Sequence, residues 1–317
     1  MAFRLRAEES VAHGLQRLAK KNLRAALDEL GRTSPPSDEA IYEARTRLKK
    51  ARAILHTIQV DDGRLNRDEK RLRKVSRILS SLRDADAMEQ IFVKLRDRDP
   101  HLFSEHTFAR LRRQLTSHRR EVMETAARDG IWEKACRHVR KLRRAAKQWR
   151  PTHREFGALA RALRISHKDG RKAMARALKH QGADDFHAWR KAIKSLWYQL
   201  RLIEPCGPRI RRDVAALHRA AACLGDDHNL AVLCAELSQH ALSCDATVDF
   251  DRVQLAADRY RCELRNKAIA GMRSLLERKS RAYVREIRRA WQARRQRERT
   301  APHATLAPHS GRLASTL

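Results

Sequence analysis

The chain has 317 residues, and its 70 lysines and arginines outnumber its 38 aspartates and glutamates, which gives a formal net charge of +32. Such a charge destabilises a compact state by self-repulsion and predicts a polyanionic partner, whose binding releases counterions. A hydrophobic content of 42% excludes a disordered basic tail as the main body, and the sequence shows no secretory signal, no apolar run of transmembrane length and no paired cysteines.

Helical periodicity runs along almost the whole chain, and no segment has the alternating pattern of a strand, so we predict an all-α protein. Glycine and proline are few and mark the breaks, for example at Pro35-Pro36, Asp99-Pro100 and Pro151. The predicted helices, in chain order, are Ala7–Leu30, Asp38–Ile58, Arg64–Leu95, Ser104–Arg128, Trp132–Trp149, Glu155–His180, Asp184–Ile203, Pro208–Ala241 and Asp249–Arg297. We expect the last of these helices to be broken near Gly271.

The two halves of the chain repeat a set of residues at a constant offset of 145 positions. The matched pairs are Arg45 and Arg190, Lys49 and Lys194, Leu55 and Leu200, Ile58 and Ile203, Arg64 and Arg209, Arg67 and Arg212, Asp68 and Asp213, Leu72 and Leu217, and Leu79 and Leu224. Three preceding residues recur 147 positions later, and these pairs are Arg17 and Arg164, Lys21 and Lys168, and Arg24 and Arg171. We interpret the repeat as an internal duplication, which predicts two antiparallel four-helix bundles packed side by side, in residues 1–150 and 151–298. Residues 299–317, rich in Ala, Pro, Ser and Thr, are predicted to form a disordered tail.

One helix of each half carries a stripe of basic residues. Arg45, Lys49 and Arg52 lie at i, i+4 and i+7, which stacks them on one side of a helix, and Arg190 and Lys194 repeat this spacing. The opposite sides carry the apolar residues Ile41, Leu48, Leu55, Phe186, Ile193 and Leu200. Because like charges one turn apart repel, a purely structural helix would intersperse carboxylates among them. A single stripe is more often a solvated face, but its repetition beside matched apolar residues favours contact with a ligand.

Neighbouring helices add basic residues at helical spacing, namely Arg17, Lys20, Lys21, Arg24, Lys70, Arg73, Lys74 and Arg77. Phosphates along a chain are closer together than one helical turn of about 5.4 Å, so several facing helices match them better than one helix does. Lysine and arginine bind phosphate oxygens by charge-assisted hydrogen bonds and need no base for this. A further stripe, Arg278, Arg281, Arg285 and Arg288, is interspersed with Glu277 and Glu286, so a solvated face and a supplementary binding patch both stay open for it.

The run from Phe186 to Leu202, FHAWRKAIKSLWYQLRL, resembles the signature segment of the CHAD family, the conserved histidine α-helical domains. The segment Leu224 to Leu230 is similar to the family's Leu-Gly turn after the third helix, Arg83-Asp84 adds support, and the resemblance extends from Ser10 to Arg295. It implies two four-helix bundles with pseudo-twofold symmetry around a basic cavity that binds inorganic polyphosphate, often at polyphosphate granules. Tyr42 stands where the family typically has histidine. We see no attached triphosphate-tunnel domain, which the family sometimes carries, so the sequence resembles the stand-alone form of the family.

The combined prediction is a soluble, cytoplasmic polyphosphate-binding protein that uses no metal or cofactor and has no membrane partner. The expected polyphosphate-binding residues are Arg17, Lys21, Arg24, Arg45, Lys49, Lys50, Arg52, Lys74, Arg77, Arg164, Lys168, Arg171, His187, Arg190, Lys191, Lys194 and Arg201. His187 is a candidate for phosphate contact and equally for a hydrogen-bonded position in the interior, because neutral histidine serves either role.

Three other functions follow from the same features. A groove for polyphosphate also attracts RNA and DNA, but an aromatic content of 5% leaves few stacking surfaces, so we expect at most weak, non-specific binding of nucleic acid. An enzyme that metabolises polyphosphate would need a metal, for which Asp226, Asp227 and His228, or Asp84 and Asp86, are the candidates. We expect these carboxylates to lie at helix ends as caps, and we predict a binding protein rather than an enzyme. A granule scaffold that binds other proteins is compatible with polyphosphate binding.

Overall fold

The computed structural model describes residues 3–6, 8–59, 65–241 and 250–300. All regular structure in these residues is helical, so the predicted all-α class is confirmed. The helices are α1 (Val11–Leu30), α2 (Asp38–Gln59), α3 (Asn66–Arg98), α4 (Glu105–Arg128), α5 (Ile131–Ala145), α6 (Phe156–His180), α7 (Ala183–Arg201), α8 (Pro208–Ala241), α9 (Phe250–Leu276) and α10 (Ser280–Thr300), with short 3-10 helices η2 (Ala146–Gln148) and η3 (Glu204–Cys206). Most of the predicted tail, residues 301–317, lies outside the described residues.

Local chemistry explains where several helices begin. The Ser10 hydroxyl accepts a hydrogen bond from the backbone N–H of His13, so α1 begins at Val11 rather than at the predicted Ala7. Ser104 caps α4 in the same way. Gly130, at φ 60°, occupies the left-handed region that glycine tolerates, at the bend of the chain between α4 and α5.

The last predicted helix is broken, as expected, but its position near Gly271 is wrong, because α9 continues through this residue to Leu276 and α10 begins at Ser280. The buried side chain of His167 on α6 supplies the physical reason. One ring nitrogen, Nε2, bonds to the carbonyl oxygen of Leu275 at 3.1 Å, and Nδ1 bonds to the hydroxyl of Ser280 at 2.9 Å. The imidazole thus satisfies polar groups on both sides of the break, whereas a single exposed glycine leaves the helix intact.

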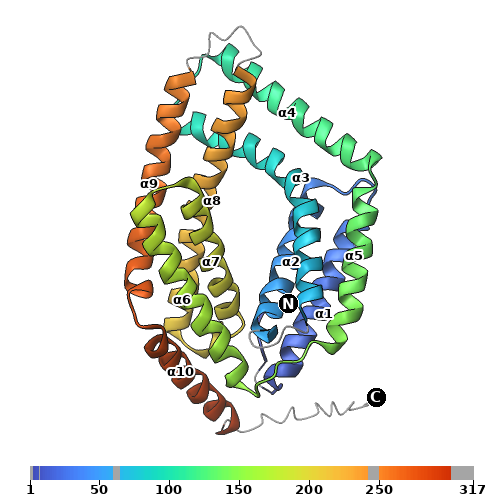
Figure 1. Cartoon of the computed structure of the whole chain (residues 1–317), viewed down its shortest axis with the longest axis vertical. Coiled ribbons are helices and arrows are strands. Elements are labelled where there is room, and N and C mark those ends of the chain that lie inside the picture. Colours follow the sequence, from blue (N-terminus) through green and yellow to red (C-terminus); the bar gives the residue numbers. More distant parts are fainter. Residues whose placement is uncertain (1–2, 7, 60–64, 242–249, 301–317) are drawn as a thin grey trace, which may run out of the picture.

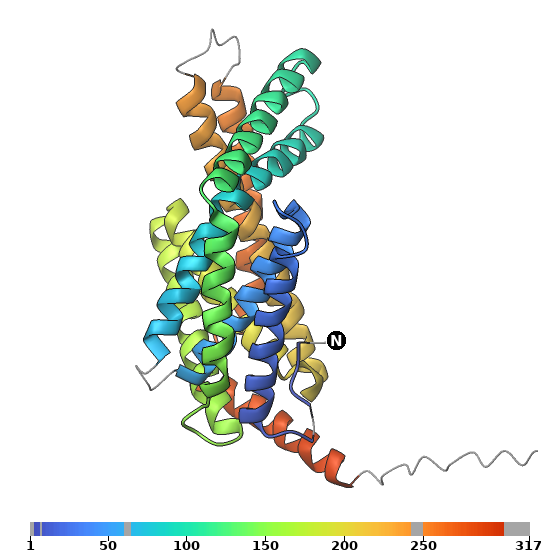
Figure 2. The ribbon, with the colours of Figure 1, turned by 90° about the vertical axis from the view of Figure 1, so that its right-hand side faces the viewer.

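The helices form two arms that meet at both ends of the elongated molecule (Figure 1). In one arm α1, α2, α3 and α5 contact one another in a ring, and in the other arm α6, α7, α8 and α9 do so. The arms contact each other where α2 packs on α6 and α7 and where α3 packs on α8. Seen edge-on, α10 lies at the lower end of the molecule, opposite the region of α3 and α4 at the upper end (Figure 2).

Two hydrophobic cores hold this arrangement together. The larger one fills the arms and includes the predicted apolar residues Ile41, Leu48, Leu55, Phe186, Ile193 and Leu200, all of which are buried. The smaller one joins the far parts of α3 and α8 to α4 and α9, around the stacked rings of Phe92 and Phe108, whose centroids are 5.0 Å apart. The extension of α3 and α8 beyond the arms is therefore stabilised by burial of apolar side chains.

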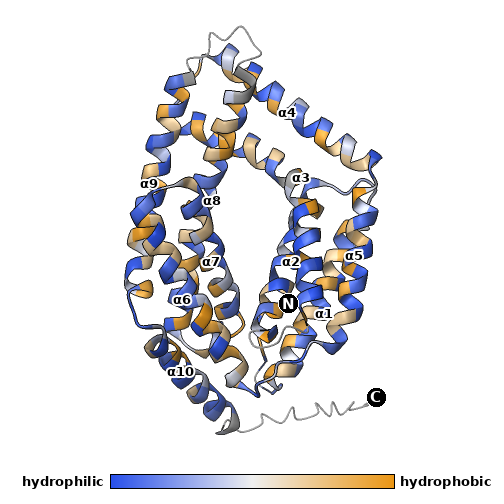
Figure 3. Cartoon of the chain, viewed as in Figure 1, coloured by the Kyte–Doolittle hydropathy of each residue, from blue (hydrophilic) through white to orange (hydrophobic). Residues whose placement is uncertain are grey.

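Hydrophobic and hydrophilic residues alternate around each helix, as in amphipathic helices (Figure 3). Among the helices that the structure describes, none has both the length and the apolar character needed to cross a membrane. The described cysteines are all free, with Cys136, Cys206 and Cys234 buried, Cys223 partly buried and Cys262 exposed.

Candidate functional site

The helices that carry the repeated basic stripes, α2 and α7, pack against each other. Arg45 and Lys49 on α2 and Arg190 and Lys194 on α7 are all partly buried, and we call these four residues the α2–α7 seam. The positive charges of Arg190 and Arg45 both act on the Lys194 ammonium group. The structure therefore brings cations from two distant parts of the sequence into one electrostatic neighbourhood.

The two arginines of the seam are backed by the two longest helices. The Nη1 group of Arg45 donates to the hydroxyl of Ser80 on α3 at 3.0 Å. The Nε group of Arg190 donates to the backbone oxygen of Ala221 on α8 at 3.4 Å. A Cβ atom on Gly225 would lie 3.3 Å from Nε and Nη2 of Arg190, so glycine allows this guanidinium to lie close to the α8 backbone.

Ser80 and Gly225 are positions that the sequence reasoning missed. They are 145 residues apart, which is the offset that relates Arg45 to Arg190. Each therefore contacts the arginine of its own half at an equivalent place. The 145-residue offset relates the two positions, but serine and glycine have no side-chain chemistry in common, so a search for repeated residue types does not find this pair.

The Lys194 ammonium group is held where positive charge is disfavoured. Burial, together with the nearby charges of Arg190 and Arg45, lowers the pKa of Lys194 to about 8. An anion placed beside this group would offset both the burial and the repulsion. The seam is thus electrostatically suited to a negatively charged ligand.

The N-terminal segment packs between Lys50 of α2 and Arg201 of α7. The Phe3 ring centroid is 5.9 Å from Nζ of Lys50 and 5.7 Å from the guanidinium carbon of Arg201, and the ring meets Tyr198 edge-on. Burial and the charges of Arg47 and Arg201 lower the pKa of Lys50 to about 8. These two predicted residues therefore face each other across an aromatic side chain for which the sequence analysis proposed no role.

The predicted histidine, His187, is paired with a second histidine. Its ring centroid is 3.8 Å from that of His228 on α8. Burial, then the charges of His228, Lys191 and Arg190, lowers the pKa of His187 to about 4, so the ring is neutral at pH 7. Its Nδ1 atom is buried and has no hydrogen-bond partner among the described residues.

The other predicted residues do not join the seam as one group. Arg17 is paired with Glu9, with Nε to Oε2 at 2.8 Å, and Nε of Arg24 is 3.9 Å from a carboxylate oxygen of Asp28. Arg52 on α2 and Arg171 on α6 are partly buried. The exposed residues of the set are Lys21, Arg24, Lys74, Arg77, Arg164, Lys168 and Lys191. Arg164 lines a separate cleft between α6 and α10. Arg45, Arg190 and Lys194, which belong to pairs matched at the 145 offset, converge at the seam, whereas the residues matched at the 147 offset have other neighbours.

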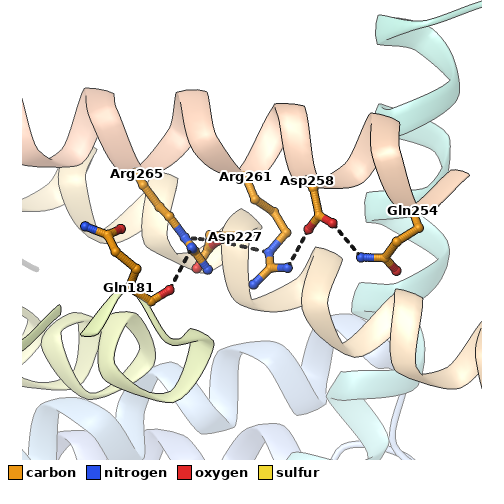
Figure 4. Close-up of polar contacts among 6 residues, drawn as sticks. All are labelled: Gln181, Asp227, Gln254, Asp258, Arg261 and Arg265. Atoms are coloured by element: carbon orange, nitrogen blue, oxygen red, sulfur yellow. Dashed lines mark hydrogen bonds and ion pairs between the residues drawn. The ribbon is translucent and has the colours of Figure 1, made fainter. Parts of the chain in front are cut away.

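Asp226 and Asp227, two of the four aspartates considered as metal ligands, are paired with basic side chains, whereas Asp86 accepts hydrogen bonds from the Gln90 amide. Nζ of Lys94 donates to Asp226 at 2.9 Å. Asp227, only 1% exposed, accepts hydrogen bonds from Nε of Arg261 at 3.2 Å and from Nε of Arg265 at 2.8 Å (Figure 4). Within the described residues, no group of three or more His, Cys, Asp or Glu side chains is placed to hold a metal ion.

These aspartates lie inside helices, so the expectation that they cap helix ends is wrong. Asp226 and Asp227 belong to α8, and Asp84 and Asp86 belong to α3. The Leu224-Gly225 step is likewise not a turn, because α8 runs unbroken from Pro208 to Ala241. The glycine lies against Arg190, where it allows close approach of a side chain and interrupts no hydrogen bonding.

The recurring aspartates Asp68 and Asp213 have a structural role. The indole N–H of Trp149 donates to Asp68 at 2.9 Å, and the hydroxyl of Tyr283 donates to Asp213 at 3.2 Å. In each case an aromatic donor from a later helix or turn anchors the start of a long helix.

A comparison with protein-family models identifies a CHAD domain over residues 6–238, and the chain therefore belongs to the CHAD domain family. Domains of this family are polyphosphate-binding modules. The match includes α1 to α7 and most of α8, while α9 and α10 lie beyond it, so it ends before the predicted limit at Arg295. Comparisons with curated proteins and with solved structures give no match.

Proposed function

We propose that this protein binds inorganic polyphosphate at the α2–α7 seam. The observation that carries the proposal is the convergence on Lys194 of positive charge from both arms, through Arg45 and Arg190. A chain of phosphates supplies several negative charges at short intervals, and guanidinium and ammonium groups bind its oxygens by charge-assisted hydrogen bonds. The net charge of +32 adds a longer-range attraction for such a polyanion.

We propose that the binding residues belong to two duplicated halves, residues 1–150 and 151–298, which surround a basic cavity. Two matched sets of contacts support this. Arg45 contacts Ser80 as Arg190 contacts Gly225, and Asp68 accepts a bond from an aromatic donor as Asp213 does. A pseudo-twofold arrangement places equivalent cations on opposite sides of one linear ligand.

Two aromatic residues of the signature segment favour polyphosphate over nucleic acid, and a third, the partly buried Trp197, is covered by Arg201 at 4.8 Å from its ring centroid. Trp189 is fully buried and Tyr198 is 6% exposed, so neither presents a ring face on which a base could stack. Single-stranded nucleic acids gain much of their affinity from such stacking. A ligand without bases, such as polyphosphate, does not depend on stacking for its affinity.

We propose a binding module rather than an enzyme, because Asp226 and Asp227, two of the candidate metal ligands, are engaged in ion pairs with Lys94, Arg261 and Arg265. Association with polyphosphate granules in the cytoplasm follows as a proposal from the nature of the ligand.

Titration with polyphosphates of defined length, across a range of salt concentrations, tests the proposal. Two double variants, Arg45→Ala with Lys49→Ala and Arg190→Ala with Lys194→Ala, should each weaken binding at least about tenfold and reduce the salt slope by about two, since each removes two phosphate contacts. Helicity by circular dichroism should persist in both. Lys172→Ala with Lys179→Ala, which removes two exposed cations of α6, is the matched control and should leave affinity nearly unchanged.

Unchanged affinity in both seam variants, or loss of helicity in them, contradicts the proposal. Competition between polyphosphate and RNA at equal phosphate concentration addresses the nucleic-acid alternative. Preference for RNA would support that alternative.

A further inference from the structure

A cleft of about 450 Å³ lies between α6 and α10, and arginine dominates its lining. The arginines are Arg161 and Arg164 of α6 and Arg281, Arg285 and Arg288 of α10. The other lining residues are His153, Gly157, Ala160 and Val284, so the lining contains no carboxylate and no Phe, Tyr or Trp. Its volume is within the range of ligand-binding pockets.

The nearby carboxylates are engaged with other basic residues. Glu286 of α10 forms an ion pair with Arg209 at 2.6 Å and a second ion pair with Arg278. Glu155 is paired with Arg295 at 2.8 Å. Glu277, the other carboxylate interspersed in this stripe, is 3.6 Å from Arg273. The two acidic residues that made a solvated face plausible in the sequence are therefore directed to arginines outside the lining.

Three of the lining arginines lack partners in the described part of the chain. Neither an ion pair nor a hydrogen bond is made there by Arg164, Arg281 or Arg285, while the guanidinium of Arg288 lies 5.4 Å from the ring centroid of Phe156. Converging guanidinium groups repel one another, and this cost is offset when an anion binds between them.

The spacing of the arginines distinguishes between phosphate ligands. Along α10, residues 281, 285 and 288 span about 10 Å at a rise of about 1.5 Å per residue, and the two arginines of α6 add to the same cleft. A nucleic-acid strand with one charge per roughly 3.4 Å offers about three phosphates over this length. An inorganic phosphate chain has no sugar between its phosphates and therefore carries more charge over the same distance. The absence of aromatic residues from the lining also removes the stacking surface that bases require.

We infer that the α6–α10 cleft is a second polyphosphate-binding site, separate from the α2–α7 seam. This inference rests on the proposed function for the identity of the ligand. The cleft is partly formed by α10, which lies outside the matched family segment and at the outer lower corner of the molecule (Figure 1). Two sites on one molecule allow it to hold two segments of polyphosphate, so that one protein links neighbouring chains.

Calorimetric titration with tripolyphosphate tests this by stoichiometry. The unchanged protein should bind two ligands, whereas Arg281→Ala with Arg285→Ala should bind one, and Arg190→Ala with Lys194→Ala should also bind one. The control, Arg259→Ala with Arg289→Ala, removes two exposed arginines that do not line the cleft and should retain both sites. Circular dichroism establishes that each variant is folded.

Light scattering with long-chain polyphosphate measures linking directly. The unchanged protein and the control should form large assemblies, and each site variant should lose them while still binding the chain.

If the cleft variant keeps two sites and the seam variant loses one, the inference fails and the proposed function stands. If neither variant loses a site, both fail. Selective loss of RNA-oligonucleotide binding, with tripolyphosphate stoichiometry unchanged, would assign the cleft to nucleic acid and overturn the inference.

Discussion

Buried or partly buried basic side chains occur in two regions of this molecule with different neighbours. Between α8 and α9, Arg261 and Arg265 share the carboxylate of Asp227, and a wider set of hydrogen bonds includes the Gln181 carbonyl (Figure 4). At the α2–α7 seam, the charges that act on Lys194 are those of two further cations. In the first region a buried carboxylate faces the arginines, and in the second the charges that act on Lys194 are positive.

The difference separates a structural use of arginine from a ligand-binding use. A buried cation with a carboxylate partner holds two helices together, and removal of the partner leaves an uncompensated charge. A cation that faces other cations lowers stability and gains its compensation when an anion binds. Substitutions in the first region should therefore act on stability, and those in the second on affinity.

The largest expected effect is the loss of stability on substitution of Asp227. Asp227→Asn leaves Arg265 without its carboxylate and Arg261 with Asp258 alone, and because Asp227 is 1% exposed, the free energy of unfolding should fall by about 3 kcal/mol. That corresponds to roughly 5 °C in Tm for a chain of this size. Thermal unfolding followed by circular dichroism measures the loss. A Tm within 2 °C or so of the unchanged protein would show that the network contributes little.

The substitution Gly225→Ala offers a sharper test, because it changes one contact of the seam and removes no charge. In Gly225→Ala the added Cβ lies 3.3 Å from the Arg190 guanidinium, which must shift and lose its bond to the Ala221 oxygen. We expect polyphosphate affinity to fall by about tenfold, or about 1.4 kcal/mol. Stability should not fall, because alanine favours the helix over glycine by about 1 kcal/mol.

Gly271→Ala is the matched control for this substitution. A Cβ atom at this exposed position of α9 meets nothing within 4 Å, so the variant should gain helix stability and bind polyphosphate normally. Equal affinities in the two variants would mean that the Arg190 position is irrelevant to binding.

The sequence predicts much of this contrast but not its geometry. Arg45, Lys49, Arg190 and Lys194 were identified because repetition makes a charge pattern informative, and the buried apolar residues beside them fix which way the helices face. The sequence could not reveal that Arg17 is paired with Glu9, since that contact depends on the path of the N-terminal segment.

Other parts of the site depend on distant residues in the same way. The break after α9 was placed at a glycine, although the deciding residue is His167, more than a hundred positions earlier. His228 was considered only as a metal ligand, and its stacking on His187 follows from the packing of α7 on α8. Periodicity predicts helices and their buried faces, whereas side-chain partners come from tertiary packing.

The smallest expected effect is a dependence of binding on pH. Lys194 and Lys50 have pKa values of about 8 in the folded protein, against an ordinary value of 10.5. A bound polyanion favours their protonated forms, so affinity should be full below pH 7 and fall about threefold to fivefold by pH 9 as both lose their protons. Calorimetry at pH 8 in two buffers of different ionisation enthalpy should detect proton uptake on binding.

The stability of the ligand-free protein should change in the opposite direction. Between pH 8 and 10.5 the unfolded chain binds more protons at these two lysines than the folded chain does, so the free energy of unfolding contributed by them rises with pH. In Lys194→Arg the side chain stays charged across this range, and both the fall in affinity and the proton uptake should become smaller. If Lys194→Arg and Lys50→Arg each bind polyphosphate with the same pH profile as the unchanged protein, neither ammonium group titrates on binding. The charge state of Lys194 would then be independent of the ligand, which would contradict the expected effect of a bound polyanion on this ammonium group.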